Sequence, residues 1–175
     1  MITGNKAISC CFSGHRTAFF DMDNSYLADI MREALETAIT GAIAQGFTIF
    51  YSGMAMGFDI IAAEMIIRHK QATAAEISLI CVVPFSGQEI RWRKKWRTRH
   101  DDVLRAADSI RVLNDRYIRG CYHERNRYLV DNSARLICLY GDKAGGTKHT
   151  YDYAEKSGLE IVNIWQVIQN QEPLN

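Results

Sequence analysis

The chain has 175 residues, of which 47% are hydrophobic and 23% charged, and its formal net charge is +1. This length suits one domain with a real core, and the near-zero charge excludes the overall basic field of many nucleic-acid-binding proteins. The five cysteines form no Cys-x-x-Cys pair, and no apolar run approaches the ~20 residues that span a bilayer. We therefore expect a cytoplasmic protein with buried thiols, no metal, no cofactor and no membrane partner.

Short apolar runs alternate with helical patterns along the whole chain. In chain order we predict a strand at 6–12, a helix at 26–45, a strand at 47–51, a helix from 58 to about 74, a strand at 77–83 and a long helix from 88 to about 107. A strand at 109–113, a helix at 122–133, a strand at 134–140, a short helix at 149–156 and a strand at 160–165 follow.

The strand patterns are apolar throughout and do not alternate with polar residues. Such strands are buried on both faces, which is typical of parallel sheets. We therefore predict an α/β fold, a doubly wound and mainly parallel sheet of about six strands with helices on both faces. Residues 1–165 are expected to form one domain, and residues 166–175 a polar tail that frays. Right-handed crossovers would place every strand-to-helix loop on one sheet edge, where ligands bind in open sheets.

The stretch from Ser52 to Asp59 is a strand end, a glycine loop and a helix start. Gly53 and Gly57 lie four residues apart in it, with Met54 directly after the first glycine. Glycine lets a ligand approach the backbone closely. Backbone N–H groups and the helix dipole at such a junction favour a phosphate. Asp59 would cap free N–H groups or accept a sugar hydroxyl. A tight turn without a ligand is the alternative.

Two further loops on this edge carry candidate ligand contacts. Gly145, Gly146 and Thr147 follow a strand and precede a helix in the same manner, so they are a second candidate phosphate contact, or else an ordinary turn. The first loop reads Ser13-Gly14-His15-Arg16, in which the arginine could pair with a phosphate and the histidine could bind or transfer a proton.

Two charged residues on helices are candidates for catalysis. Arg125 lies on the apolar side of its predicted helix, so we expect it to face the sheet. Its anionic partner would be Asp59, Glu64 or a ligand phosphate. Glu64 would act as a base or ribose ligand, but a pair with Arg68 one helical turn away is the favoured interpretation.

Basic and aromatic residues interleave between 91 and 99, as in some single-strand binders. Nucleic-acid contact would use Arg91, Arg93, Lys94 and Arg97. The favoured alternative is that Trp92 and Trp96 form a packing stripe while the cations face water.

These motifs together resemble the SLOG superfamily, and the YpsA-like branch of bacteria in particular. The resemblance rests on Phe12-Ser13-Gly14-His15-Arg16, on the stretch from Ser52 to Asp59 and on the late Gly-Gly-Thr, and it spans residues 6–165. It implies a Rossmann-like fold that binds nucleotides, nucleotide-derived signals or nucleic acid.

Two better-known SLOG branches frame the function. The LOG phosphoribohydrolases cleave nucleoside monophosphates with an arginine, which the resemblance carries onto Arg125, and with a glutamate after their Gly-Gly-x-Gly-Thr motif. Here Lys148, His149 and Thr150 follow Thr147, so that glutamate is missing. The DNA-processing DprA proteins have a Ser-Gly-x-Ala-x-Gly-Ile-Asp motif close to the stretch from Ser52 to Asp59, and they bind single-stranded DNA.

The leading prediction is therefore a protein that binds a nucleotide, a nucleotide-derived ligand or a sugar phosphate, as a sensor or regulator. A LOG-like N-glycosidase and a DprA-like single-strand binder are the alternatives. The missing glutamate argues against an enzyme but leaves the question open. Assembly with further copies of the chain is also expected.

Overall fold

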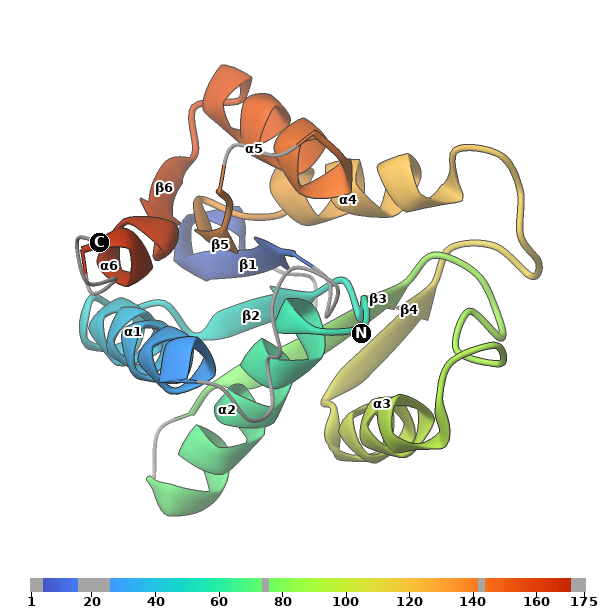
Figure 1. The fold of residues 1–175 in the computed structure, drawn as a ribbon, viewed down its shortest axis with the longest axis horizontal. Helices are drawn as coiled ribbons and strands as arrows, with labels where there is room; N and C mark the ends of the chain where they lie inside the picture. The colour runs from blue at the N-terminus through green and yellow to red at the C-terminus, as the bar shows by residue number, and fades with distance from the viewer. Residues whose placement is uncertain (1–4, 16–25, 74–75, 142–143, 171–175) are drawn as a thin grey trace.

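A computed structural model describes residues 5–15, 26–73, 76–141 and 144–170. Its strands form one six-stranded sheet, all parallel, in the order β4-β3-β2-β1-β5-β6 (Figure 1). The strands are β1 (Ser9–Gly14), β2 (Ile49–Ser52), β3 (Ser78–Val83), β4 (Ser109–Val112), β5 (Arg135–Leu139) and β6 (Glu160–Asn163). The helices are α1 (Tyr26–Ala44), α2 (Phe58–Ala72), α3 (Lys94–Ala106), α4 (Cys121–Asp131), α5 (Gly146–Lys156) and α6 (Trp165–Gln169).

Helices cover both faces of this sheet and create two cores. Figure 1 shows α4 and α5 on one face and α1, α2, α3 and α6 on the other. Successive strand residues point to opposite faces. Cys10 and Phe12 accordingly join the core under α1 and α2, while Cys11 joins the core under α4 and α5. The predicted doubly wound, Rossmann-like parallel fold is therefore confirmed.

All five cysteines are free and buried in these cores. Burial away from water raises the pKa of Cys11 and of Cys81 to about 12, and it raises the pKa of Cys10 and Cys138 further still. The thiols at these four positions therefore stay protonated at neutral pH and serve as small apolar side chains.

Three predicted element starts are wrong, and one of them is the helix predicted at 149–156, which begins three residues earlier at Gly146. The first predicted strand begins as a short 3-10 helix (Lys6–Ile8), because the Asn5 side chain accepts a hydrogen bond from the Ala7 N–H. The long helix predicted from 88 begins only at Lys94. The segment before it forms turns, with Gly87 at φ +80°, and the buried Gln88 amide donates to the carbonyl of Met54 at 3.0 Å. That contact anchors the segment to the loop after β2.

The predicted polar tail also differs from the structure. Residues 165–169 form α6, and Ile168 is fully buried in the core that includes α1. Ile164 and Trp165 pack against the same core and help to anchor this short helix. Residues 171–175 lie outside the described residues, as do Arg16 and the remainder of 16–25. In the ranges that are described, no helix is long and apolar enough to cross a membrane.

The strand order places a switch point beside β1. The chain winds from β1 outwards to β4, and then returns to add β5 and β6 on the other side. The loops after β1 and β5 therefore diverge to opposite faces of the sheet and leave a crevice between them. Ligands of doubly wound sheets bind in such crevices.

Candidate functional site

The loop after β2 is held by the protein's own hydrogen bonds. The Met54 N–H donates to Ser52 Oγ at 3.2 Å, and the Ala55 N–H donates to Asp59 Oδ2 at 3.4 Å. Ser52 Oγ in turn donates to the backbone carbonyl of Asp59 at 2.9 Å. Two of the N–H groups predicted to cradle a phosphate thus already have internal acceptors, while Met54 holds the left-handed conformation at φ +55°.

Arg125 connects this loop to α4. It is buried, with 4% of its surface exposed, and Nη1 donates to the carbonyl of Gly53 and lies 3.8 Å from Asp59 Oδ2. Its Nε donates to Asn126 Oδ1 at 2.7 Å. The prediction that Arg125 faces the sheet is therefore confirmed, and Asp59 is one of its anionic partners.

Two motif glycines are required by packing within the protein. A Cβ at Gly53 would lie 2.4 Å from Arg125 Nη1, and a Cβ at Gly14 would lie 2.4 Å from the ring of Phe58. No real Cβ tolerates such contacts. A side chain at either position would force Arg125 or Phe58 to shift, whether or not a ligand approaches.

His15 lies in the loop after β1 and contacts the loop after β5. The Gly141 N–H donates to His15 Nε2 at 3.0 Å, so this nitrogen carries no proton and the ring links the loops after β1 and β5. Arg16, the cation predicted beside it, lies outside the described residues.

The start of α5 is exposed, whereas the start of α2 is buried, although in the part of the chain that the structure describes both helices have a glycine N-cap without a side-chain hydrogen bond. The N-cap of α5 is Gly145 at φ +146°, and within the described residues no side chain caps the helix. The first N–H groups of a helix have no acceptor inside it. A Cβ at Gly145 would meet nothing within 4 Å, and one at Gly146 would approach only Asn126 Nδ2, at 4.0 Å. The helix start is therefore open to a ligand.

These loops surround a cavity of about 370 Å³, which we call the switch-point cavity. Of the predicted ligand residues, its lining includes Ser13, Gly14, His15, Asp59, Arg125, Gly145, Gly146 and Thr147. Among the described residues, Ser52, Gly53, Met54 and Gly57 stay outside this lining and belong to the loop that positions Ala55 and Asp59.

The sequence prediction missed four lining residues: Ala55, Tyr122, Ala144 and Asn126. Two of them carried a usable signal. Tyr122 lies three residues before Arg125 and four before Asn126 on α4, so it shares a helix face with each of them.

Glu64 is not part of this cavity. It forms a two-point ion pair with Arg99 of α3, at 2.7 Å to Nε and 2.6 Å to Nη2. The favoured pairing of Glu64 with Arg68 is therefore wrong as the main contact, because α3 crosses α2 at this point and brings a better-placed guanidinium. Within the described residues, no cluster of three or more His, Cys, Asp or Glu side chains could hold a metal ion.

The basic stretch lies at the start of α3. Arg91, Arg93, Lys94 and Arg97 are exposed, whereas Trp96 is buried and Trp92 is half-buried against the core. The interpretation of the tryptophans as a packing stripe is therefore confirmed.

The comparisons with known proteins agree with this architecture. The model of the YspA SLOG family matches residues 10–169. A UPF0398 protein of Halalkalibacterium halodurans is 32% identical over 158 residues, which cover 89% of this chain and 79% of the relative. A UPF0398 protein of Bacillus velezensis is 28% identical over 141 residues, or 78% of this chain and 76% of the relative.

Two solved structures share the fold. The DNA processing protein A (DprA) of Streptococcus pneumoniae superposes with a TM-score of 0.60 at 14% identity over 97% of this chain. The DprA of Helicobacter pylori, which is described as binding single-stranded DNA, superposes with a TM-score of 0.56 at 18% identity over 88%. This chain spans 63% of either DprA chain, so the likeness concerns their shared fold.

Proposed function

Because the chain belongs to the YspA SLOG family, we propose that it binds a nucleotide or nucleotide-derived ligand in the switch-point cavity, as a sensor or regulator. The phosphate of the ligand lies at the start of α5, against the N–H groups of Gly146 and Thr147. The sequence predicts a phosphate between Gly53–Gly57 and Gly145–Thr147; here we propose the second of these loops alone.

The observation that carries the proposal is the exposed, uncapped start of α5, which lines this cavity. A helix N-terminus carries about half a positive charge and presents N–H donors, which together attract an anion. Within the described ranges the start of α2 also lacks a side-chain cap, but its first residues are buried, and the Asp59 carboxylate lies there and accepts from the Ala55 N–H of the preceding loop. At the start of α5, Gly145 and Gly146 leave open space for a ligand.

The remaining lining residues suit the rest of a nucleotide. Arg125 supplies a buried positive charge, Asp59 a carboxylate for a sugar hydroxyl, and Tyr122 a ring on which a base can stack. A volume of about 370 Å³ is within the usual range for small-ligand pockets.

Binding accounts for these residues better than hydrolysis does. A LOG-like reaction would need a carboxylate beside Arg125, but Glu64 is paired with Arg99, and Asp59 is engaged by Arg125 and the Ala55 N–H. We therefore propose no reaction.

The substitution Gly146→Asp tests this site. We expect it to weaken nucleotide binding by about 100-fold, since its carboxylate would repel the phosphate by about 2.7 kcal/mol. The fold should be kept, because an acidic residue in the first turn of a helix stabilises it by about 0.3–1 kcal/mol. Isothermal titration calorimetry across mono-, di- and cyclic nucleotides measures the affinity, and thermal unfolding measures the stability.

The matched control is Gly146→Asn, which adds the same bulk without the charge and should retain most of the affinity. Ligand at 100 Kd should also stabilise the wild-type protein by about 2.7 kcal/mol. If no nucleotide binds the wild-type protein, or if Gly146→Asp binds as tightly as Gly146→Asn, this site is refuted.

Single-stranded nucleic acid is a second candidate ligand, favoured by the exposed basic start of α3. Five exposed cations gather there, Lys95 among them, on a chain whose fold is shared with a single-strand-binding DprA. Because Trp92 and Trp96 pack inward, such binding would rest on phosphate contacts and not on stacking with these rings.

Neutralising Arg93, Lys94 and Arg97 together tests this candidate. Each phosphate contact to a single strand adds about 0.7 to the slope of log affinity against log salt, so losing three contacts should flatten that slope by about 2. Fluorescence anisotropy with a labelled oligonucleotide at several salt concentrations measures it. An unchanged slope would exclude this surface as the binding site.

A further inference from the structure

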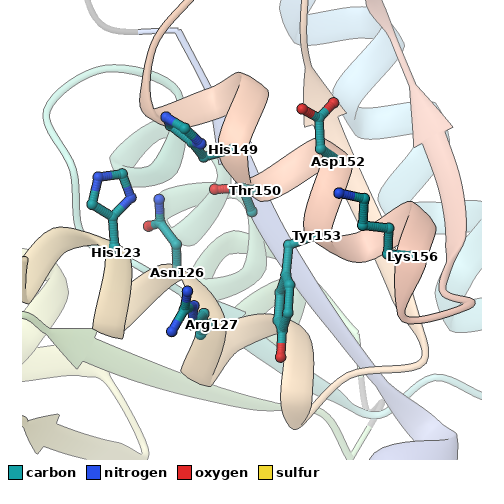
Figure 2. Close-up of a pocket in the computed structure, with 8 residues that line it drawn as sticks. All are labelled: His123, Asn126, Arg127, His149, Thr150, Asp152, Tyr153 and Lys156. Carbon is teal, nitrogen blue, oxygen red and sulfur yellow. The ribbon is translucent and has the colours of Figure 1, made fainter.

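A second cavity lies between α4 and α5, and we call it the interhelical cavity. Its volume is about 240 Å³. Figure 2 shows its lining, in which residues of α4 stand opposite residues of α5. The lining consists of His123, Asn126, Arg127, His149, Thr150, Asp152, Tyr153 and Lys156. Of these described residues, only Asn126 is shared with the lining of the switch-point cavity.

The interhelical cavity has an excess of positive charge. Arg127 and Lys156 line it, and the Arg127 guanidinium lies 5.9 Å from the centre of the Tyr153 ring. Asp152, its acidic lining residue, is paired with Lys148 at 2.7 Å. The rings of His123 and His149 meet edge to face, with their centres 4.9 Å apart, and add further N–H groups. This set of side chains suits an anion.

Asn126 connects this cavity to the switch-point cavity, since its side chain lines both. Its Oδ1 accepts a hydrogen bond from Arg125 Nε at 2.7 Å, and its Nδ2 lies 3.5 Å from the carbonyl oxygen of Gly146. From Gly146 to the level of His149 and Tyr153 the helix rises by about 5–10 Å. That interval is close to the length of one nucleotide.

We propose that the interhelical cavity is a subsite for a second phosphate. The ligand would then hold one phosphate at the start of α5 and another between α4 and α5, near Arg127 and Lys156. The ligand class is therefore two nucleotide units joined by a phosphodiester, either a free dinucleotide or the end of a single strand. This inference rests on the proposed nucleotide site and adds the size of the ligand to it.

The test compares adenosine 5′-monophosphate with 5′-phosphorylated diadenylate by calorimetry. We expect the dinucleotide to bind the wild-type protein at least tenfold more tightly. The double substitution Arg127→Gln with Lys156→Gln should reduce this preference to about twofold and leave the affinity for the mononucleotide unchanged. A 5′-phosphorylated octaadenylate distinguishes the end of a single strand from a free dinucleotide as the ligand. If it binds more tightly than the dinucleotide, the ligand is a strand end; if the two affinities are equal, the ligand is a free dinucleotide.

The control is Lys6→Gln with Arg105→Gln, which removes the same charge from exposed positions that line neither cavity. It should preserve the preference for the dinucleotide, and circular dichroism checks that both double variants fold. Equal binding of mono- and dinucleotide overturns the second subsite alone, as does a preference that survives Arg127→Gln with Lys156→Gln. Failure of both nucleotides to bind overturns the nucleotide site as well.

Discussion

Replacing Asp59 with alanine is expected to lower the free energy of unfolding by about 3–5 kcal/mol, the usual cost of removing one partner of a buried ion pair. Asp59 and Arg125 are both about 95% buried, and the carboxylate lies 3.8 Å from the guanidinium. The substitution takes the carboxylate partner away from a buried cation and also removes the acceptor of the Ala55 N–H. Equilibrium unfolding in urea measures the loss.

Three further variants separate the causes of this loss. Asp59→Asn keeps an acceptor for the Ala55 N–H and should recover part of the stability. Adding Arg125→Met to Asp59→Ala removes the buried guanidinium that has lost its carboxylate. The double variant should therefore be more stable than Asp59→Ala alone. Asp29→Ala, which breaks the exposed pair with Arg32, should cost no more than about 1 kcal/mol. If Asp59→Ala lowered the free energy of unfolding by no more than about 1 kcal/mol, the pair of Asp59 and Arg125 would not be what holds the loop after β2 in place.

The order of strands and helices could be predicted because the patterns are local. The apolar runs of β1, β2, β3 and β5 do not alternate, and this alone indicates a sheet covered on both faces. The start of α3 could not be predicted in the same way. Gln88 leaves a helical pattern because its side chain bonds Met54, which lies 34 residues away in the chain. The last helix, α6, depends likewise on distant contacts, since Ile164, Trp165 and Ile168 all pack against the core that includes α1.

The site shows the same division between local and distant causes. Helix periodicity alone predicts that Arg125 faces the sheet. The right-handed crossovers of a parallel sheet predict that the loops after β1, β2 and β5 lie at one edge. The partner of Glu64 could not be read from spacing, because Arg99 reaches it from another helix. Nor could the sequence distinguish glycines that face a ligand from glycines that face a side chain. Gly146 opens on a cavity, while Gly14 and Gly53 touch Phe58 and Arg125.

The glycine motifs therefore interlock. Gly14, from the first motif, receives the ring of Phe58, which follows the glycine loop of the second motif. Gly53, in that second motif, receives Arg125 from α4. Each contact fixes one wall of the switch-point cavity against another, so the two motifs can be required for the shape of the site even where they do not touch a ligand.

The contact between Gly14 and Phe58 yields the second large expected effect. Phe58→Ala should destabilise the protein by about 3–5 kcal/mol, because it empties a fully buried ring position at the start of α2. Gly14→Ala should cost about 1–3 kcal/mol, because its Cβ would lie 2.4 Å from two ring carbons of Phe58 and force them to shift. Urea unfolding of both variants measures these losses.

The double variant then decides whether the ring is the cause. With the ring gone, the new methyl group of Gly14→Ala occupies part of the emptied space, so the combined loss should fall short of the sum by about 0.5–3 kcal/mol. The rescue is partial, because Phe58 Cβ itself would remain 2.6 Å from the added atom. Gly41→Ala, at a position where an added Cβ meets nothing within 4 Å, is the matched control and should be additive with Phe58→Ala. If the Gly14 and Phe58 losses also add in full, the packing of the two motifs against each other is not what requires glycine at position 14.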